Sequence, residues 1–227
     1  MMMSFLGKLW AIILKDLTAE FRSKEMVLSM TLFSFLVLII FSFALGTGAM
    51  NLKEIIPGIL WVAFIFSSLM GIGRSFGLEQ DRGTLRGLVL CPVSPWGIYL
   101  AKVTGTLIFT AIMEIFTLAI FTILYNLNLL PFLFPLSLVI FLGTLGFTTI
   151  GTIFSAMTAT AKSREVILSI LVFPISVPVI IASVKATGTI LDGESIQAVY
   201  SWLKILVAFD LVFLLLAYLT FGFIMEE

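Results

Sequence analysis

Long runs of apolar residues dominate the pattern along the chain. Six of them reach the length of about 20 residues at which a helix rising 1.5 Å per residue crosses a hydrocarbon core of about 30 Å. They cover residues 26–45, 55–73, 98–125, 132–159, 166–184 and 202–224. Strands would show alternation, and lipid offers no partner to free backbone groups, so each run predicts a transmembrane helix. The chain is therefore predicted to be an all-α, polytopic membrane protein with a six-helix domain over residues 26–225.

The first 25 residues have a different pattern. Lys8, Lys15 and Arg22 recur every seven residues on one face of a helix, opposite a face of leucine and isoleucine. This predicts an N-terminal amphipathic helix, residues 1–25, that lies in the membrane interface. A helix packed on protein would show the same pattern, so both interpretations stay open.

Basic residues are unequally divided between the two sides of the predicted spans. Ten of the 13 lysines and arginines, all except Lys53, Lys185 and Lys204, fall on the side of the N-terminus. Because cytoplasmic loops carry the excess of basic residues, we expect both termini in the cytoplasm.

Three prolines mark expected bends. Pro57 stands at the start of the second run, and Pro174 and Pro178 lie inside the fifth. Proline removes a helical hydrogen bond and clashes with the preceding turn. We expect the fifth helix to be broken or kinked at these residues.

Composition excludes most chemistry. Hydrophobic residues make up 60% of the chain and charged residues 11%, which is incompatible with a water-soluble enzyme. The formal net charge is zero, so nothing in the electrostatics favours nucleic acid. The chain has no histidine and one cysteine, Cys91, which excludes imidazole catalysis, histidine ligation of metal or haem, an intrachain disulfide and a cysteine metal cluster. The phosphate-binding motif of ATPases is also missing. We expect no enzyme activity, no metal and no cofactor bound by this chain.

Two carboxylates lie well inside predicted spans, Glu114 in the third and Asp210 in the sixth. An ionised carboxylate in the bilayer costs at least about 2.5–3.5 kcal/mol, so each should face protein or water, or be neutral. Each is either a polar latch between helices or a structural hydrogen-bonded acid.

The loop between the second and third spans, residues 74–97, is the most informative segment. Leu85, Leu88 and Val89 have helical spacing, Pro92 ends that pattern, and Ser94 precedes a proline as an N-cap would. The loop is predicted to hold a short amphipathic helix, which would suit either force transfer from a cytosolic partner or a simple interface helix. The loop contains the sequence pattern Glu79-x3-Gly83-Thr84-Leu85-x2-Leu88-x3-Pro92, where x is any residue.

This spacing resembles the loop of type-2 ABC exporter permeases. The stretches 57–69, with Pro57-Gly58 before Trp61-Val-Ala, and 168–178, with Pro174 and Pro178, resemble one branch, the haem exporter protein B family. That family supplies the permease subunit of the cytochrome c maturation transporter. Arg86 departs from the family, which more often has an acidic residue there.

The resemblance implies partners and a location. The six loop residues would couple the permease to a cytosolic ABC ATPase, which binds the ATP. A haem-handling membrane protein and a periplasmic haem chaperone would act beside it in a prokaryotic inner membrane, and two permease copies would pair as a homodimer. Haem would be handled by the complex, with ATP-driven motion serving haem export or release of the loaded chaperone.

Two other functions fit the same residues. One is a general type-2 exporter of lipid, polysaccharide or drugs. The other is a membrane scaffold that anchors other subunits without moving.

Overall fold

The computed structural model describes residues 5–45, 52–194 and 196–226. Within these ranges every regular element is helical, which confirms the all-α fold. The elements are α1 (Phe5–Ser23), α2 (Glu25–Leu45), α3 (Leu52–Asp81), α4 (Leu85–Val89), α5 (Pro95–Leu124), the 3₁₀ turn η1 (Leu130–Phe132), α6 (Leu133–Thr158), α7 (Arg164–Leu191) and α8 (Ile196–Glu226).

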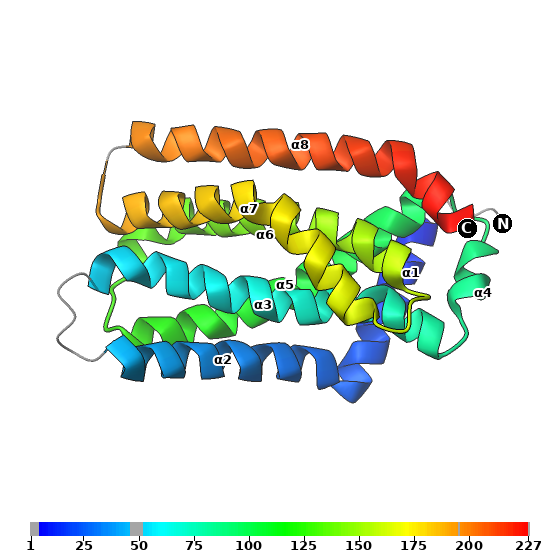
Figure 1. Cartoon of the computed structure of the whole chain (residues 1–227), viewed down its shortest axis with the longest axis horizontal. Coiled ribbons are helices and arrows are strands. Elements are labelled where there is room, and N and C mark those ends of the chain that lie inside the picture. Colours follow the sequence, from blue (N-terminus) through cyan, green and yellow to red (C-terminus); the bar gives the residue numbers. More distant parts are fainter. Residues whose placement is uncertain (1–4, 46–51, 195, 227) are drawn as a thin grey trace.

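Six helices in the described ranges are long and apolar enough to cross a membrane, which confirms the predicted spans. They are α2, α3, α5, α6, α7 and α8, and they run side by side as a bundle (Figure 1). The short helix α4, the start of α1 and the end of α8 all lie at one end of this bundle, called here the α4 end. α3 is longer than its apolar run, because it continues eight residues past Gly73 to Asp81 at the α4 end.

α1 lies against α5 and has two apolar faces. Ile12 and Ile13 are buried in the protein, whereas Leu6, Trp10 and Phe21 are more than half exposed. α1 therefore packs on the bundle and also presents an apolar surface outward. The chain turns from α1 into α2 at Lys24, which has a φ of 58°. The Glu20 carboxylate holds this junction, because it accepts hydrogen bonds from the N–H groups of Met26 and Val27 at 2.8 and 3.0 Å.

Local signals set several helix ends. The Ser94 side chain accepts a hydrogen bond from the Gly97 N–H at 3.2 Å with Pro95 at the first helical position, which confirms the predicted start of α5. The chain leaves α7, which ends at Leu191, through Gly193, whose left-handed φ of 70° suits glycine, and the Glu194 N–H donates to the Thr189 carbonyl at 3.1 Å.

The prolines do not interrupt the helices. α7 is one continuous helix through Pro174 and Pro178, and its ribbon changes direction near the middle, where they lie (Figure 1). Of the two expected outcomes, a kink agrees with this change of direction, whereas the helix is not broken, because the remaining backbone hydrogen bonds and the packing of α7 against α3, α6 and α8 keep it helical. Pro57 lies inside α3, which begins five residues earlier at Leu52, and so does not mark its start.

α6 is the central helix and packs against α3, α5, α7 and α8. Glycines allow the close approach: a Cβ on Gly151 would lie 2.6 Å from Ile72 of α3. Three of its threonines satisfy their hydroxyls within the helix: Thr148 and Thr152 each donate at 2.7 Å to the carbonyl one turn earlier, and Thr158 does the same at 2.8 Å.

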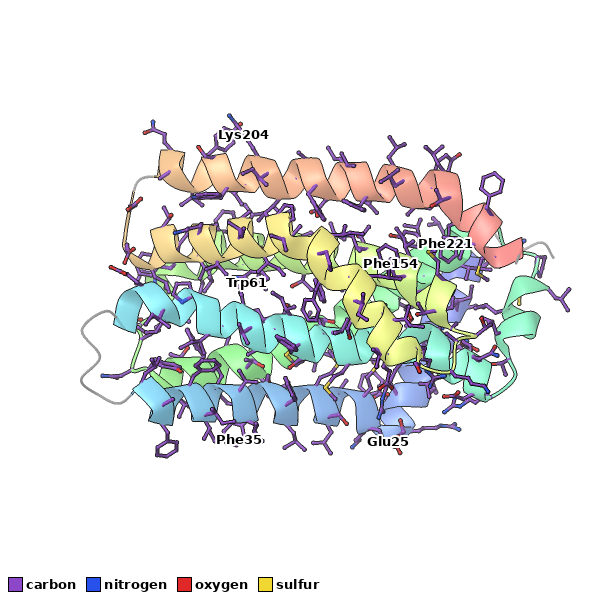
Figure 2. The ribbon with its side chains drawn as sticks, viewed as in Figure 1. Glu25, Phe35, Trp61, Phe154, Lys204 and Phe221 are labelled. Atoms are coloured by element: carbon purple, nitrogen blue, oxygen red, sulfur yellow. The ribbon has the colours of Figure 1, made fainter. Side chains whose placement is uncertain are left out.

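Trp61 of α3 occupies the closest of these contacts. Its ring points into the bundle, in contrast to Phe35 of α2, which points outward (Figure 2). The Trp61 side chain is 2% exposed and its Nε1–H donates to Thr187 of α7 at 2.9 Å. The ring lies against Gly143 of α6, so this contact joins three helices.

We predict that Gly143→Ala destabilises the bundle, because the added Cβ would overlap the Trp61 ring and the Ser183 Oγ. The ring is held by its hydrogen bond and cannot move aside, so overpacking should cost roughly 1–3 kcal/mol. The thermal unfolding midpoint in detergent measures this effect. Gly222→Ala in α8 is the matched control, because its Cβ would meet no atom within 4 Å. Equal midpoints for Gly143→Ala and wild type would contradict the packing described.

Candidate functional site

The turn between α3 and α4 is built by Gly83 and Thr84. Gly83 has a φ of 67°, a conformation that glycine adopts without strain. The Thr84 N–H donates to the Glu79 carbonyl at 2.8 Å, and the Thr84 hydroxyl donates to the Glu79 carboxylate. The Leu88 N–H then donates to the Thr84 carbonyl at 3.0 Å, which begins α4. Glu79, Gly83 and Thr84 therefore form one structural unit, at the base of the loop.

The apolar face of α4 packs on its own chain. Leu88 is 6% exposed and lies in a cluster with Ile12 of α1 and Ile98 of α5, and Leu85 packs partly buried against the same cluster. Helical spacing indicated an apolar face but not which surface covers it. On the loop, Leu90 is instead 83% exposed, and Cys91 and Pro92 are exposed beside it. The side chains of Arg86 and Val89 lie outside the described part.

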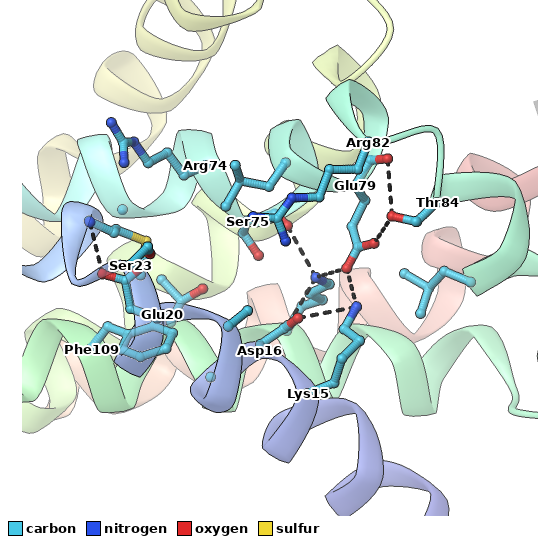
Figure 3. A pocket seen from close by; sticks show the side chains of 18 of the residues that line it. Lys15, Asp16, Glu20, Ser23, Arg74, Ser75, Glu79, Arg82, Thr84 and Phe109 are labelled. Carbon is cyan, nitrogen blue, oxygen red and sulfur yellow. Dashed lines mark hydrogen bonds and ion pairs between the residues drawn. The ribbon is translucent and has the colours of Figure 1, made fainter.

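Below this turn, Glu79 enters a partly buried network of charges, which we call the Lys102 network: Lys15, Asp16, Glu79 and Lys102. The Lys102 Nζ lies 3.0 Å from the Glu79 carboxylate, 2.9 Å from the Asp16 carboxylate and 3.1 Å from the Ser75 carbonyl oxygen (Figure 3). Lys15 pairs with both Glu79 and Asp16. Three helices meet here, because Lys15 and Asp16 are on α1, Glu79 is on α3 and Lys102 is on α5.

The charges in the Lys102 network balance. The Lys102 side chain is 2% exposed and the Glu79 side chain 9%, and a buried charge is stable only when it is paired and hydrogen-bonded. The Lys102 Nζ also lies 5.4 Å above the Phe76 ring, a cation–π distance. Burial disfavours the charged form of Lys15, but the hydrogen bond to Glu79 and the two carboxylates outweigh it and hold the pKa of Lys15 above its ordinary value. Lys15 is therefore cationic at neutral pH.

This arrangement can transmit displacement. Glu79 contacts the α4 turn through Thr84 and contacts α5 through Lys102, which in turn pairs with Asp16 of α1. A displacement of the turn would therefore pull on α5 and α1 through these bonds. On the other side of α3, the Arg164 guanidinium of α7 donates to both carboxylate oxygens of Asp81 at 2.7 Å. The last turn of α3 is therefore tied to α1, α5 and α7.

Sequence reasoning missed three of the four residues of the Lys102 network. It placed Lys15 on the charged face of an interfacial helix, left Asp16 out, and counted Lys102 only toward orientation. One signal was present: Lys102 falls inside the predicted span 98–125, and a charge inside a span requires a partner.

The two intramembrane acids, Glu114 and Asp210, do not belong to the Lys102 network. Glu114 is 5% exposed and accepts a hydrogen bond from the Thr144 hydroxyl of α6. It stands twelve residues along α5 from Lys102, about 18 Å of helix rise. Asp210 is 3% exposed on α8, and its carboxylate has no hydrogen-bond partner among the described residues. One of its oxygens lies 2.6 Å from where a Cβ on Gly146 of α6 would stand.

The described residues contain no group of three or more histidine, cysteine, aspartate or glutamate side chains placed to hold a metal ion. The Lys102 network itself has two carboxylates already neutralised by two lysines. Its four side chains therefore bind one another and connect α1, α3 and α5.

Comparison with a family model and with individual proteins points to the same family in each case. The sequence model of a family described as "CcmB protein" matches residues 7–226. The chain is similar to Heme exporter protein B of Haemophilus influenzae, with 32% identity over 189 residues and 83% of each chain covered. It is 30% identical over 178 residues to Heme exporter protein B of Escherichia coli K12, covering 78% of this chain and 80% of that one. With the protein of the same name from Pseudomonas aeruginosa it shares 26% identity over 193 residues, 84% and 85% of the two chains.

We predict that Lys102→Met destabilises the α4 end, because it leaves Asp16 and Glu79 sharing Lys15 alone. Removing one member of a buried ion pair costs roughly 3–5 kcal/mol, and the remaining lysine places this case at the low end. Thermal unfolding in detergent, with protease cleavage within α1 as a local readout, measures the effect. Lys185→Met, at an exposed lysine of α7, is the control.

Glu79 and Lys102 can be tested for an energetic interaction with each other. Glu79→Gln combined with Lys102→Met should cost less than the sum of the two single changes, because each single change leaves an uncompensated charge. Strict additivity would show that Glu79 and Lys102 do not depend on each other.

Proposed function

Since the chain belongs to the CcmB protein family, we propose that it is the permease subunit of a haem-export ABC transporter that serves cytochrome c-type biogenesis. The observation that carries this proposal is the Lys102 network, which ties the α4 turn to three helices of the bundle. Haem export is inferred from the names of the relatives. The Lys102 network connects the α4 turn to the transmembrane helices, so a movement of the turn would reach them.

The energy comes from a separate cytosolic ATPase. The sequence has no phosphate-binding motif of its own, so ATP binds on the partner. In this proposal the α4 end faces the cytoplasm together with both termini, as the ten basic residues on that side favour. The protein then sits as a multi-pass subunit in a bacterial inner membrane.

The ATPase docks on the exposed part of the loop. Leu90 and Pro92 present the accessible surface there, whereas Leu85 and Leu88 hold α4 on the bundle from beneath. Gly83 and Thr84 set the shape of the turn, and Glu79 passes its displacement to α5. All six loop residues thus serve coupling, but by different means.

Movement of α5 reaches the centre of the bundle. Glu114 is on the same helix as Lys102 and is hydrogen-bonded to Thr144 of α6. Displacement at the α4 end is therefore carried to α6, which contacts four of the other spans. The chain pairs with a second copy of itself, as expected of a transporter with two membrane halves.

Haem is handled beside this subunit and not ligated by it. The chain has no histidine, the most common axial ligand of haem iron. In this proposal a haem-handling membrane protein and a periplasmic chaperone hold the haem, and ATP-driven motion of the permease exports haem or releases the loaded chaperone.

Deletion of the gene, followed by haem staining of mature c-type cytochromes, tests the function. Loss of staining that the wild-type gene restores supports haem export for cytochrome assembly. Normal staining in the deletion strain would favour a general exporter of lipid, polysaccharide or drugs. A permease that restores staining without copurifying any ATPase would favour a scaffold.

We predict that Leu90→Asp lowers the amount of copurified ATPase about tenfold or more, because it places a charge in the apolar contact. It should also abolish complementation while the permease stays in the membrane at wild-type level. Leu130→Asp is the matched control, since Leu130 is 75% exposed in the connection between α5 and α6 at the opposite end of the bundle. Unchanged copurification with Leu90→Asp would remove this surface from the docking site.

The purified protein alone should bind haem weakly, without the spectrum of a low-spin, bis-ligated iron. The physical reason is the missing imidazole, which leaves only methionine, tyrosine and Cys91 as side-chain ligands. Absorption spectra during haem titration measure this. A tight one-to-one complex whose spectrum changes on substitution of a single methionine would contradict it.

A further inference from the structure

A cavity of about 520 Å³ lies beside the Lys102 network and follows α5 into the bundle (Figure 3). At the α4 turn it is lined by the exposed residues Arg82 and Thr84, so it opens to solvent there. On α5 its lining extends from Lys102 to Phe109, about 10 Å of helix rise. A water molecule takes about 30 Å³ in the liquid, so the cavity has room for several.

Polar groups along the cavity favour water inside it. Glu20, Ser23 and Arg74 line one part of the cavity, and Thr106 lines it on α5. Gly105, beside Thr106, is buried in the protein, yet a Cβ built on it would meet no atom within 4 Å. Open space next to polar groups is the setting in which proteins hold internal water. We therefore expect water from the α4 turn as far as Thr106.

Thr110 lies one turn beyond Thr106 on α5 and has a hydroxyl without a partner. The side chain is 0% exposed, and its oxygen has no hydrogen bond with the described residues. Threonine in a helix commonly bonds to the carbonyl one turn earlier, as Thr117 and Thr122 of the same helix do at 2.8 and 2.7 Å. A buried hydroxyl left unbonded is destabilising, so water is the expected partner of Thr110.

Glu114 follows one further turn along α5. It is 5% exposed, and one of its oxygens accepts the hydrogen bond from Thr144 of α6. Among the described residues nothing bonds its other oxygen, and no lysine or arginine pairs with it. An ionised carboxylate without a cation is unstable at this depth, so the acid holds a proton.

The spacing of these three side chains suits bridging by water. Thr106, Thr110 and Glu114 stand four residues apart, so they are neighbours along the helix surface with about 6 Å of rise between them. One water bridges such a gap with two hydrogen bonds of about 2.8 Å each. Helical side chains also lean toward the N-terminus of their helix, which brings the Glu114 carboxyl toward Thr110.

Other titratable groups are remote from Glu114 or separated from it. Residues 26–45 of α2, 55–73 of α3 and 133–158 of α6 contain none. Asp210 of α8 contacts Gly146, which is about 200° around α6 from Thr144, so α6 lies between the two acids. The remaining groups on α1, α5 and α8 are toward the ends of the bundle: Lys8, Lys15, Asp16, Glu20, Arg22, Tyr99, Lys102, Tyr200, Lys204, Tyr218 and Glu226.

We propose that Glu114 is a proton-binding site that exchanges its proton with water at the α4 end, through the cavity and past Thr106 and Thr110. A proton that leaves the carboxyl passes to the water bridging Glu114 and Thr110 and reaches the cavity as hydronium. A proton returning by the same route restores the neutral acid. The two threonines are positioning residues, because each hydroxyl accepts one hydrogen bond and donates the next. This proposal depends neither on haem export nor on ATPase docking.

Infrared spectroscopy of the full-length protein, in a detergent without ester groups, tests the proposal. A protonated carboxyl has a C=O band that a carboxylate lacks, and the band shifts when deuterium replaces the proton. The band lost in Glu114→Gln belongs to Glu114, and Asp210→Asn identifies any band of Asp210. We expect a Glu114 band at neutral pH that shifts in D₂O. If Glu114→Gln keeps the wild-type thermal midpoint and loses no band, or if the band never shifts, the proposal is overturned.

A single threonine tests the relay. Thr110→Val removes the hydroxyl and should slow the D₂O shift of the Glu114 band about tenfold, the effect of one lost hydrogen bond on a rate. Thr122→Val is the matched control on the same helix, because its hydroxyl is already bonded to the Leu118 carbonyl and lies beyond Glu114. It should exchange at the wild-type rate. An equal rate in Thr110→Val and Thr122→Val would exclude the relay.

A thiol reagent tests whether the route passes through the cavity. In a Cys91→Ser background, which removes the one native thiol, Thr106→Cys should react with a charged methanethiosulfonate. Once labelled, this protein should exchange the Glu114 proton more slowly. Thr117→Cys should not react, because Thr117 is 0% exposed and does not line the cavity. Failure of Thr106→Cys to react, or exchange that labelling leaves unchanged, would place the route elsewhere and overturn the proposal.

Discussion

The burial of one ammonium group constrains the whole α4 end of this protein. Lys102 is on a transmembrane helix, its side chain is 2% exposed, and its charge is stable there only because Asp16 and Glu79 reach it from two other helices. The position of α1 across α5 places Asp16 near this group, and the extension of α3 past its apolar run places Glu79 there. Thr84 of the α4 turn holds the Glu79 carboxylate by a hydrogen bond. The electrostatic requirement thus joins the same helices, α1, α3 and α5, that the apolar cluster beneath α4 also holds together.

Apolar packing explains the rest of the bundle. The main cluster of buried residues runs through α2, α3, α5, α6, α7 and α8, and a second, smaller one lies beneath α4 and includes Ile13, Phe76, Leu88 and Tyr99. The Lys102 network lies beside this second cluster, since Phe76 belongs to the cluster and also underlies the Lys102 ammonium. The α4 end therefore combines an apolar support with a charged junction, and both join the α4 turn to the helices beneath it.

Much of this architecture could be predicted from the sequence, because length and hydropathy determine what can cross a bilayer. The six spans, the short helix at Leu85 and the Ser94 cap all follow from local patterns. The inward packing of Leu88 could not be predicted, because helical spacing reveals an apolar face but does not say which residues pack against it. The Lys102 network was also beyond local patterns, because its members stand as far apart as Asp16 and Lys102 and meet only when α1 folds back on α5. Continuity of α7 through Pro174 and Pro178 depends likewise on its neighbours.

The threonines of α6 have a consequence for motion. Thr148, Thr152 and Thr158 each satisfy their hydroxyl within their own helix, so what they present to the neighbouring helices is chiefly a methyl group. Their contacts across the central interface are therefore non-directional. A small rotation of α6 about its axis would exchange one set of van der Waals contacts for another without leaving any of these three hydroxyls unpaired. The orientation of α6 is fixed instead by its directional contacts, the hydrogen bond from Thr144 to Glu114 of α5 and the one from Ser155 to the Ile72 carbonyl of α3 at 2.8 Å.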